Sequence, residues 1–522
     1  MNIIIESLPA LLIALPLFGA FLTPVIGRFA PKLCHPWVLL AGAVSSAAAV
    51  WTAVTVFLYG TRTYVFGAAA GSSGLAEPLG IPVRIMFTID AFGAFMLLSA
   101  GIVSFAALLY LIAGQKNRSG KPGFYAVYLL LTAGIFGMVS TGDLFNFFVF
   151  LEINSLAASA LAAYHRKGGL AVEGAVKYLV VNTIGGLMVL FAIGLLYAQY
   201  NSLNMAVIAS QITPTTLSLL AAVLFIAALG MKAGSVPFHF ATPDAYSVAP
   251  SGVTALMIVA SQAGLYGMFR ILFNVFGGVF NTTTFGWILI VLGVLSMVVG
   301  VTMAIPQKDV KRLLAYHAVS QTGYMLLGVG VCLAVLNDAA AMAAYGETAL
   351  EGGLFHIFNH AMYKGLLFLA VGAVIYRTGV WSLNKMGGLG HSMKWTMVFF
   401  LIGALAIAGI PPFNGFASKL MIYESTFAFN PLLAVIAMVV SILTLASFMK
   451  VFHSLFMGPA LPEYEQTREV PKPMIAAMAI LTVFVVGFGI FPDVVIDTII
   501  SPAADALIQQ GTYIASVLGG CL

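Results

Sequence analysis

The chain has 522 residues, of which 61% are hydrophobic and only 8% are charged. Soluble domains carry roughly 25% charged residues, so this composition excludes a soluble globular fold and makes lipid the solvent for most of the surface. The net charge of +5 comes from residues scattered along the chain, which excludes a nucleic-acid-binding surface. Three distant cysteines, Cys34, Cys332 and Cys521, form neither a disulfide framework nor a metal motif.

Apolar runs long enough to cross a bilayer, about 20 residues each, recur about fourteen times. We therefore predict an all-α polytopic membrane protein with a short interfacial segment at 204–212 and no hydrophilic domain. The last stretch, 501–519, is short for a further span. The predicted spans are 3–27, 36–59, 86–113, 123–140, 142–164, 171–198, 215–246, 250–274, 284–305, 309–335, 345–376, 392–424, 430–457 and 471–497.

The basic residues of the connecting loops predict the orientation, because loops rich in Lys and Arg stay in the cytoplasm. Loops after even-numbered spans hold only Arg62 and Arg84. Both termini are therefore predicted outside, in a multi-pass protein of a prokaryotic inner membrane. Loops after odd-numbered spans hold Arg28, Lys32, Lys116, Arg118, Lys121, Arg166, Lys167, Lys308, Lys311, Arg312, Arg377, Lys385, Lys394, Arg468 and Lys472.

Proline interrupts two of the spans, the seventh at 231–237 and the twelfth at 408–415. Proline inside a helix removes a hydrogen bond and clashes with the preceding turn, and broken helices at corresponding places in two halves indicate inverted repeats. We predict two inverted five-helix repeats, spans four to eight and nine to thirteen; two independent kinks are the alternative. The predicted units are residues 1–122 (spans one to three), 123–274 (first repeat), 284–457 (second repeat) and 458–522 (span fourteen and tail).

Several ionisable residues fall inside predicted spans, and Glu152, Lys232 and Lys419 are the strongest candidates for a function. An ionisable group at mid-membrane costs roughly 2.5–3.5 kcal/mol and indicates function. Burial favours the neutral form of a lysine and a nearby carboxylate favours the charged form, so a pair of Glu152 with Lys232 would make a switchable proton carrier. A purely structural ion pair is the alternative. For Lys177, Arg270 and Lys450, nearer the span ends, snorkelling to the headgroups is the favoured interpretation.

Two further spans carry polar stripes. His356, His360 and Lys364 recur at every fourth position of 345–376 and so share a helix face, which favours a proton relay. Half of a metal site is the alternative, but no third ligand accompanies the histidines. His317 begins a second stripe with Ser320, Gln321 and Tyr324, for which a polar packing seam is the alternative. Asp244 after Pro243 fits a helix cap as well as a chemical role.

The motifs around these residues resemble the antiporter-like subunits shared by Mrp-type sodium/proton antiporters, respiratory complex I and membrane-bound hydrogenases. The resemblance covers about 85–515, and the Asp-Leu-Phe-Asn of 143–146 is most similar to the Mrp D subunit and its hydrogenase relatives. It implies fourteen helices in two inverted five-helix units and proton transfer along a central polar axis. The matching segments are 142–153, 231–239, 243–244, 308–324, 356–368 and 409–419.

One position departs from the family. Members often carry a bridging lysine in the eighth helix, and alignment on Tyr266 and Arg270 places Gln262 there. Glutamine forms hydrogen bonds but takes up no proton near neutral pH. The link between the halves would then depend on Gln262 with water, or on His317.

The favoured hypothesis is a proton-translocating Mrp D-type subunit of a multisubunit cation/proton antiporter, with H+ and sodium as candidate ions and other membrane subunits as partners. The same subunit type in a membrane-bound hydrogenase or complex I-like machine is the first alternative. A stand-alone solute carrier, a quinone-reacting enzyme and a structural scaffold are others. The sequence holds no haem, flavin or iron–sulfur ligand pattern, so we expect no cofactor and no redox centre in this chain.

Overall fold

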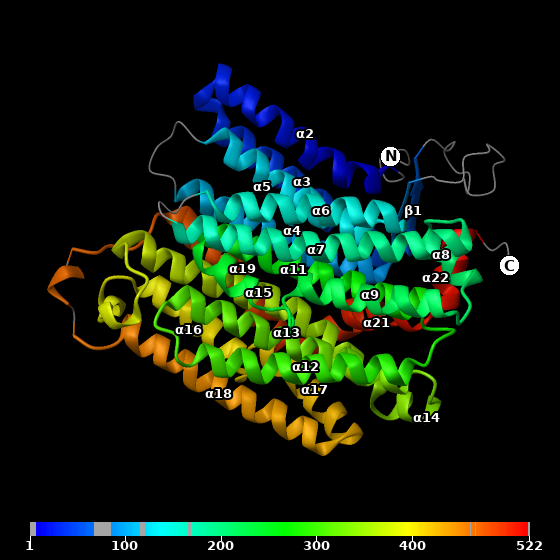
Figure 1. The fold of residues 1–522 in the computed structure, drawn as a ribbon. Helices are drawn as coiled ribbons and strands as arrows, with labels where there is room; N and C mark the ends of the chain where they lie inside the picture. Colours follow the sequence, from blue (N-terminus) through cyan, green and yellow to red (C-terminus); the bar gives the residue numbers. More distant parts are fainter. Residues whose placement is uncertain are drawn as a thin grey trace.

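The computed structural model describes residues 7–66, 85–114, 121–164, 169–459, 461–464 and 466–519. In this part of the chain thirteen helices are long and apolar enough to cross a membrane, and a pair of shorter helices makes one further crossing. The fourteen predicted spans are therefore confirmed, and they run side by side in one bundle (Figure 1). Outside the described residues lie the start of the first predicted span, Cys521 and the loop residues Arg84, Lys116, Arg118, Arg166 and Lys167.

The N-terminal helices are α2 (Leu8–Phe29), α3 (Cys34–Tyr59) and α4 (Ala91–Ala113). Strands β1 (Arg62–Val65) and β2 (Met86–Ile89) pair antiparallel between α3 and α4. The prediction of a helix from residue 86 is therefore wrong at its start. Helix α4 begins only after Asp90, whose carboxylate accepts a hydrogen bond from Gly93 N at 3.0 Å and so caps the helix.

The first repeat begins after α4, contains its own broken span and ends with α11. Helix α8 (Met205–Gln211) confirms the predicted short segment. The repeat consists of α5 (Pro122–Ser140), α6 (Leu144–Ala162), α7 (Gly169–Tyr200), the pair α9 (Thr216–Ala233) and α10 (Ala241–Val248), and α11 (Ser251–Arg270), which continues into a π-helical turn (Ile271–Val275).

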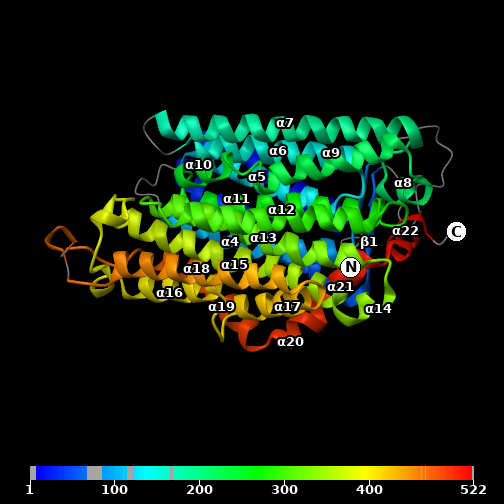
Figure 2. The ribbon, with the colours of Figure 1, turned by 60° about the horizontal axis from the view of Figure 1, so that its bottom comes forward.

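The second repeat has the same order of elements and lies beside the first (Figure 2). Helix α15 packs between α11 and α13. All three are almost wholly buried, so polar side chains on them are kept away from lipid. The repeat consists of α12 (Thr282–Ala304), α13 (Val310–Val335), α15 (Glu347–Thr378), the pair α16 (Lys394–Ala408) and α17 (Asn414–Phe429), and α18 (Pro431–Phe456), with the short α14 (Ala339–Ala341) before α15.

The C-terminal part contains one last span, α19 (Lys472–Ile490), and three short helices: α20 (Pro492–Val495), α21 (Ser501–Ile508) and α22 (Gln510–Leu518). The predicted span 471–497 thus ends early, before Pro492. Helices α21 and α22 lie at the end of the bundle that also holds β1 and α8 (Figure 1), so residues 501–519 do not form a span.

Both broken spans are built in the same way. Helix α9 ends at Gly234 (φ +69°) and α16 ends at Gly409 (φ +78°), a left-handed conformation that glycine adopts without a Cβ penalty. After each glycine the chain runs through proline, at Pro237 and at Pro411–Pro412, before the second helix starts. The predicted breaks are confirmed, and they fall in corresponding spans of the two repeats.

Candidate functional site

Glu152 and Lys232 form an ion pair inside the first repeat. Lys232, in the last turn of α9, places Nζ 3.2 Å from Glu152 Oε1 of α6 and donates to Ser155 Oγ at 2.5 Å. The lysine side chain is 6% exposed and the glutamate side chain 23%. The predicted partner of Lys232 is therefore confirmed, and Ser155, one turn after Glu152, completes the contact.

Glycine makes room for this pair. A Cβ on Gly186 of α7 would lie 1.9 Å from Glu152 Oε1, and a Cβ on Gly264 of α11 would lie 3.1 Å from Lys232 Cβ. A cavity of about 10 Å³, enough for one water, adjoins the lysine. The side chains around the pair thus form a polar pocket; the cavity is lined by Met138, Leu151, Asn154, Ser155, Tyr178, Asn182, Lys232 and Ala260.

Gln262 joins the two repeats. Its Nε2 on α11 donates to the backbone oxygen of Ile357 at 2.9 Å and lies 2.9 Å from His360 Nδ1 on α15. Because a carbonyl oxygen only accepts, the amide nitrogen must face this way, and His360 Nδ1 then accepts as well.

Lys364 lies one turn beyond His360 on α15 and is 0% exposed. Its Nζ has no hydrogen-bond partner among the described residues and lies 5.5 Å from the ring centroid of Phe448. The ring of His317 packs on the same phenylalanine at 4.8 Å, and His317 Nε2 lies 2.8 Å from Ser447 Oγ. Lys364 and His317 thus contact the same phenylalanine ring.

His356 connects the polar stripes of α13 and α15 to the second break. Its Nε2 lies 3.1 Å from Gln321 Oε1, and its Nδ1 lies 3.0 Å from Ser418 Oγ. Ser418 directly precedes Lys419 on α17. The two stripes contact each other at Gln321, whereas the Tyr324 hydroxyl donates to the backbone oxygen of Ala437.

Lys419 has no carboxylate partner among the described residues. Its Nζ donates to the backbone oxygen of Ile407 at 2.8 Å and to Ser441 Oγ at 2.9 Å, and lies 4.7 Å from the ring centroid of Tyr324. Ile407 lies in the last turn of α16, where free carbonyls carry the negative end of the helix dipole. The broken helix itself therefore compensates the charge of Lys419.

The charges nearer the span ends have specific partners. Asp244 caps no helix; its carboxylate lies 3.1 Å from Lys177 and 2.9 Å from Arg312, joining α7, α10 and α13. Lys450 donates to Ile305 O at the end of α12. The snorkelling interpretation is wrong for Arg270, which is 2% exposed.

Arg270 pairs with Asp90, a residue that the sequence alone did not identify, at 2.5 Å. The serines that contact the site residues, Ser155, Ser418, Ser441 and Ser447, were also not expected. The only sequence signal for Asp90 is its position directly before an apolar run, where it also serves as a cap. Among the described residues, no three His, Cys, Asp or Glu side chains gather as a metal ion would require.

Comparisons with known proteins identify the family of the chain. Residues 141–444 match the family described as NADH:quinone oxidoreductase/Mrp antiporter, transmembrane. The chain belongs to this family. Its match includes every predicted site residue from Glu152 to Lys419, and it spans both repeats from the start of α6 into α18.

Individual members are similar over nearly the whole chain. NADH-quinone oxidoreductase subunit N of Desulforudis audaxviator is 34% identical over 95% of this chain and 98% of its own length. The D subunit of the Na(+)/H(+) antiporter of Alkalihalophilus pseudofirmus is 32% identical over 84% of this chain and 86% of its own. A chain of the Mrp complex from Dietzia sp. superposes with a TM-score of 0.87 at 27% identity, covering 99% and 100%. The family's fold thus extends from α2 to the C-terminal helices.

Proposed function

We propose that this chain is a proton-translocating antiporter-like membrane subunit of the Mrp D type, working within a multisubunit cation/proton antiporter of a prokaryotic cell membrane. The observation that carries this proposal is the Glu152–Lys232 pair, buried at a broken helix. Moving or protonating the carboxylate would change how strongly Lys232 holds its proton, which is the step a coupled transporter needs.

The proton path that we propose starts at Glu152 and Lys232 and crosses to the second repeat at Gln262. Side-chain contacts support two segments of it, Gln262 to His360 and His356 through Ser418 to the turn of Lys419. Water would have to bridge the remaining gaps, because Gln262 takes up no proton near neutral pH. The remaining members of the proposed path are Lys364 and His317. In the proposed orientation, both termini of the chain lie outside the cell membrane.

The test compares two charge-removing variants of matched chemistry. Glu152→Gln should abolish cation-driven proton movement in everted membrane vesicles while the complex still assembles. Glu173→Gln is the control, because Glu173 also pairs with a lysine, Lys177, at 2.6 Å, but on the exposed face of α7. Wild-type transport in Glu152→Gln, or equal loss in both variants, would refute the proposal.

The host complex is a second question. The relative named as an oxidoreductase subunit favours, as the alternative, the same role in a redox-driven pump. Purification of the intact assembly distinguishes the two, because subunits with iron–sulfur centres would accompany this chain only in the redox-driven machine. Transport by the purified single chain in liposomes would instead favour a stand-alone carrier.

A further inference from the structure

A third polar stripe runs along α11, from the centre of the bundle to the end that holds β1 and the C-terminal helices. Gln262, Tyr266, Arg270 and Asn274 recur at every fourth position, in α11 and the π-helical turn after it, so they share one face. Each is at most 2% exposed. The rise from Gln262 to Arg270 is about 12 Å, and the stripe therefore connects the Gln262–His360 contact with the end of the bundle.

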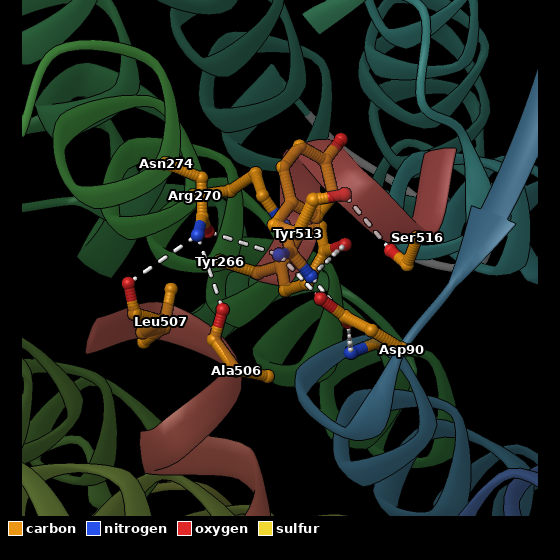
Figure 3. Close-up of polar contacts among 9 residues, drawn as sticks. Asp90, Tyr266, Arg270, Asn274, Ala506, Leu507, Tyr513 and Ser516 are labelled. Atoms are coloured by element: carbon orange, nitrogen blue, oxygen red, sulfur yellow. Dashed lines mark hydrogen bonds and ion pairs between the residues drawn. The ribbon is translucent and has the colours of Figure 1, made fainter. Parts of the chain in front are cut away.

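The guanidinium of Arg270 lies in this stripe and contacts polar and aromatic side chains around it (Figure 3). Its two terminal nitrogens lie 2.6 and 2.5 Å from the two carboxylate oxygens of Asp90, and they also donate to Asn274 Oδ1 at 2.9 Å and Tyr266 OH at 3.3 Å. The guanidinium carbon lies 5.0 Å from the ring centroid of Tyr513. The pair is thus a fixed, desolvated element of the structure.

A cavity of about 270 Å³ lies on the other side of this pair. Asp90 and Tyr513 line it, so the ion pair and the tyrosine ring separate the cavity from the α11 stripe. Asn274 holds this arrangement by donating to the backbone oxygens of Ala506 and Leu507 at 3.1 and 3.3 Å. The cavity is lined by Val56, Gly60, Thr61, Asp90, Ala91, Pro502, Asp505, Ala506, Gln509, Thr512, Tyr513 and Ser516.

We propose that Arg270, positioned by Asp90, is the barrier that keeps protons from passing between this cavity and the central polar residues. The proposal rests on the proposed function, because only a proton-conducting centre needs such a barrier. A guanidinium does not lose its proton in proteins, and its fixed positive charge on the α11 stripe repels hydronium. Asp90 and Tyr513 act as positioning residues, since they hold the charge across the stripe.

The experiment measures passive proton entry after a pH jump in liposomes that hold the intact complex, without a cation gradient. Arg270→Gln removes the charge, whereas Arg270→Lys keeps it. Both variants lose the bidentate contact with Asp90. We expect entry to rise about ten-fold or more in Arg270→Gln and to stay near the wild-type rate in Arg270→Lys. Equal leaks in both variants, or no leak in Arg270→Gln, would overturn the proposal and show that the Arg270–Asp90 pair only stabilises the fold.

A second substitution tests where the leak runs. Gln262→Leu, added to Arg270→Gln, should suppress the leak, because it removes the polar link at the central end of the stripe; an unchanged leak would overturn the proposal. Should Arg270→Gln fail to assemble because it leaves the buried Asp90 carboxylate unpaired, the double variant Arg270→Gln with Asp90→Asn takes its place. It also lacks the guanidinium charge and should leak, again suppressed by Gln262→Leu, and an absent leak would count against the barrier.

These outcomes are independent of the proposed transport function. Loss of antiport in Glu152→Gln with no leak in Arg270→Gln would remove the barrier and keep the function. A leak in Arg270→Gln with full antiport in Glu152→Gln would remove the proposed role of Glu152 and keep the barrier.

Discussion

Gly186 offers a way to move Glu152 without changing any ionisable residue. A Cβ at this position of α7 would lie 1.9 Å from Glu152 Oε1 and 2.8 Å from its Cδ, whereas ordinary van der Waals contact begins near 3.4 Å. Gly186→Ala therefore displaces the carboxylate by about 1.5 Å if atoms stay in normal contact. Because α7 packs against α6 and α9, the side chain is easier to move than the helices.

The displacement has a predictable electrostatic size. A shift of about 1.5 Å lengthens the 3.2 Å contact between Lys232 Nζ and Glu152 Oε1 to as much as about 4.7 Å. At an effective dielectric constant of about 20, this weakens the attraction by about 1.5–2 kcal/mol. One factor of ten corresponds to about 1.4 kcal/mol, so we expect proton transport to fall roughly ten-fold or more.

The assay is cation-driven proton movement in everted vesicles, followed by a pH-sensitive dye and normalised to the amount of assembled complex. Gly194→Ala is the matched control, since Gly194 lies on the same helix and its Cβ would meet no atom within 4 Å. Wild-type transport in Gly186→Ala would refute the view that the close Glu152–Lys232 contact is required. Equal loss in both variants would show that helix α7 responds to any added methyl group.

Two further substitutions test the breaks and the second repeat. Gly234→Ala should lower the melting temperature of the purified complex, because a left-handed residue with a Cβ costs about 1–2 kcal/mol and this Cβ would also lie 2.5 Å from a side-chain atom. Gly379→Ala is the control: Gly379 has a similar φ, but its Cβ would meet no atom within 4 Å, so the decrease should be smaller. An equal decrease in both variants would contradict this account. Ser441→Ala removes one hydrogen-bond acceptor of Lys419, a contact worth about 1 kcal/mol, and should slow transport several-fold. Thr444→Ala should not slow transport, because the Thr444 hydroxyl donates to the backbone of its own helix. Unchanged transport in Ser441→Ala would show that the contact with Lys419 is not needed for function.

The features that could be predicted from the sequence are those with a local signal. A membrane span is visible as an apolar run, and a broken helix is visible as proline and glycine within that run. The pairing of Glu152 with Lys232 also followed, because two opposite charges inside lipid-exposed spans have few other ways to be stabilised.

Features made by distant segments had no such signal. Residues 86–89 are as apolar as the helix that follows, and a short apolar run does not distinguish a strand from a helix; only pairing with residues 62–65 decides it. Asp90 and Arg270 are 180 positions apart, so no residue pattern near Arg270 identifies Asp90 as its partner. The acceptor of Lys419 at Ile407 is a backbone oxygen, which no side-chain pattern can reveal.

The two central lysines differ in the group that balances their charge, and this difference has a consequence for the proposed mechanism. Lys232 faces a carboxylate, which can move or take up a proton. Lys419 faces the end of α16 and a serine hydroxyl, and a helix dipole, equivalent to about half a charge, cannot be neutralised by a proton. Under the proposed function, control of proton affinity therefore belongs to the first repeat, through Glu152. Lys419 would respond instead to charge arriving from the side of His356, whose contact with Ser418 adjoins it.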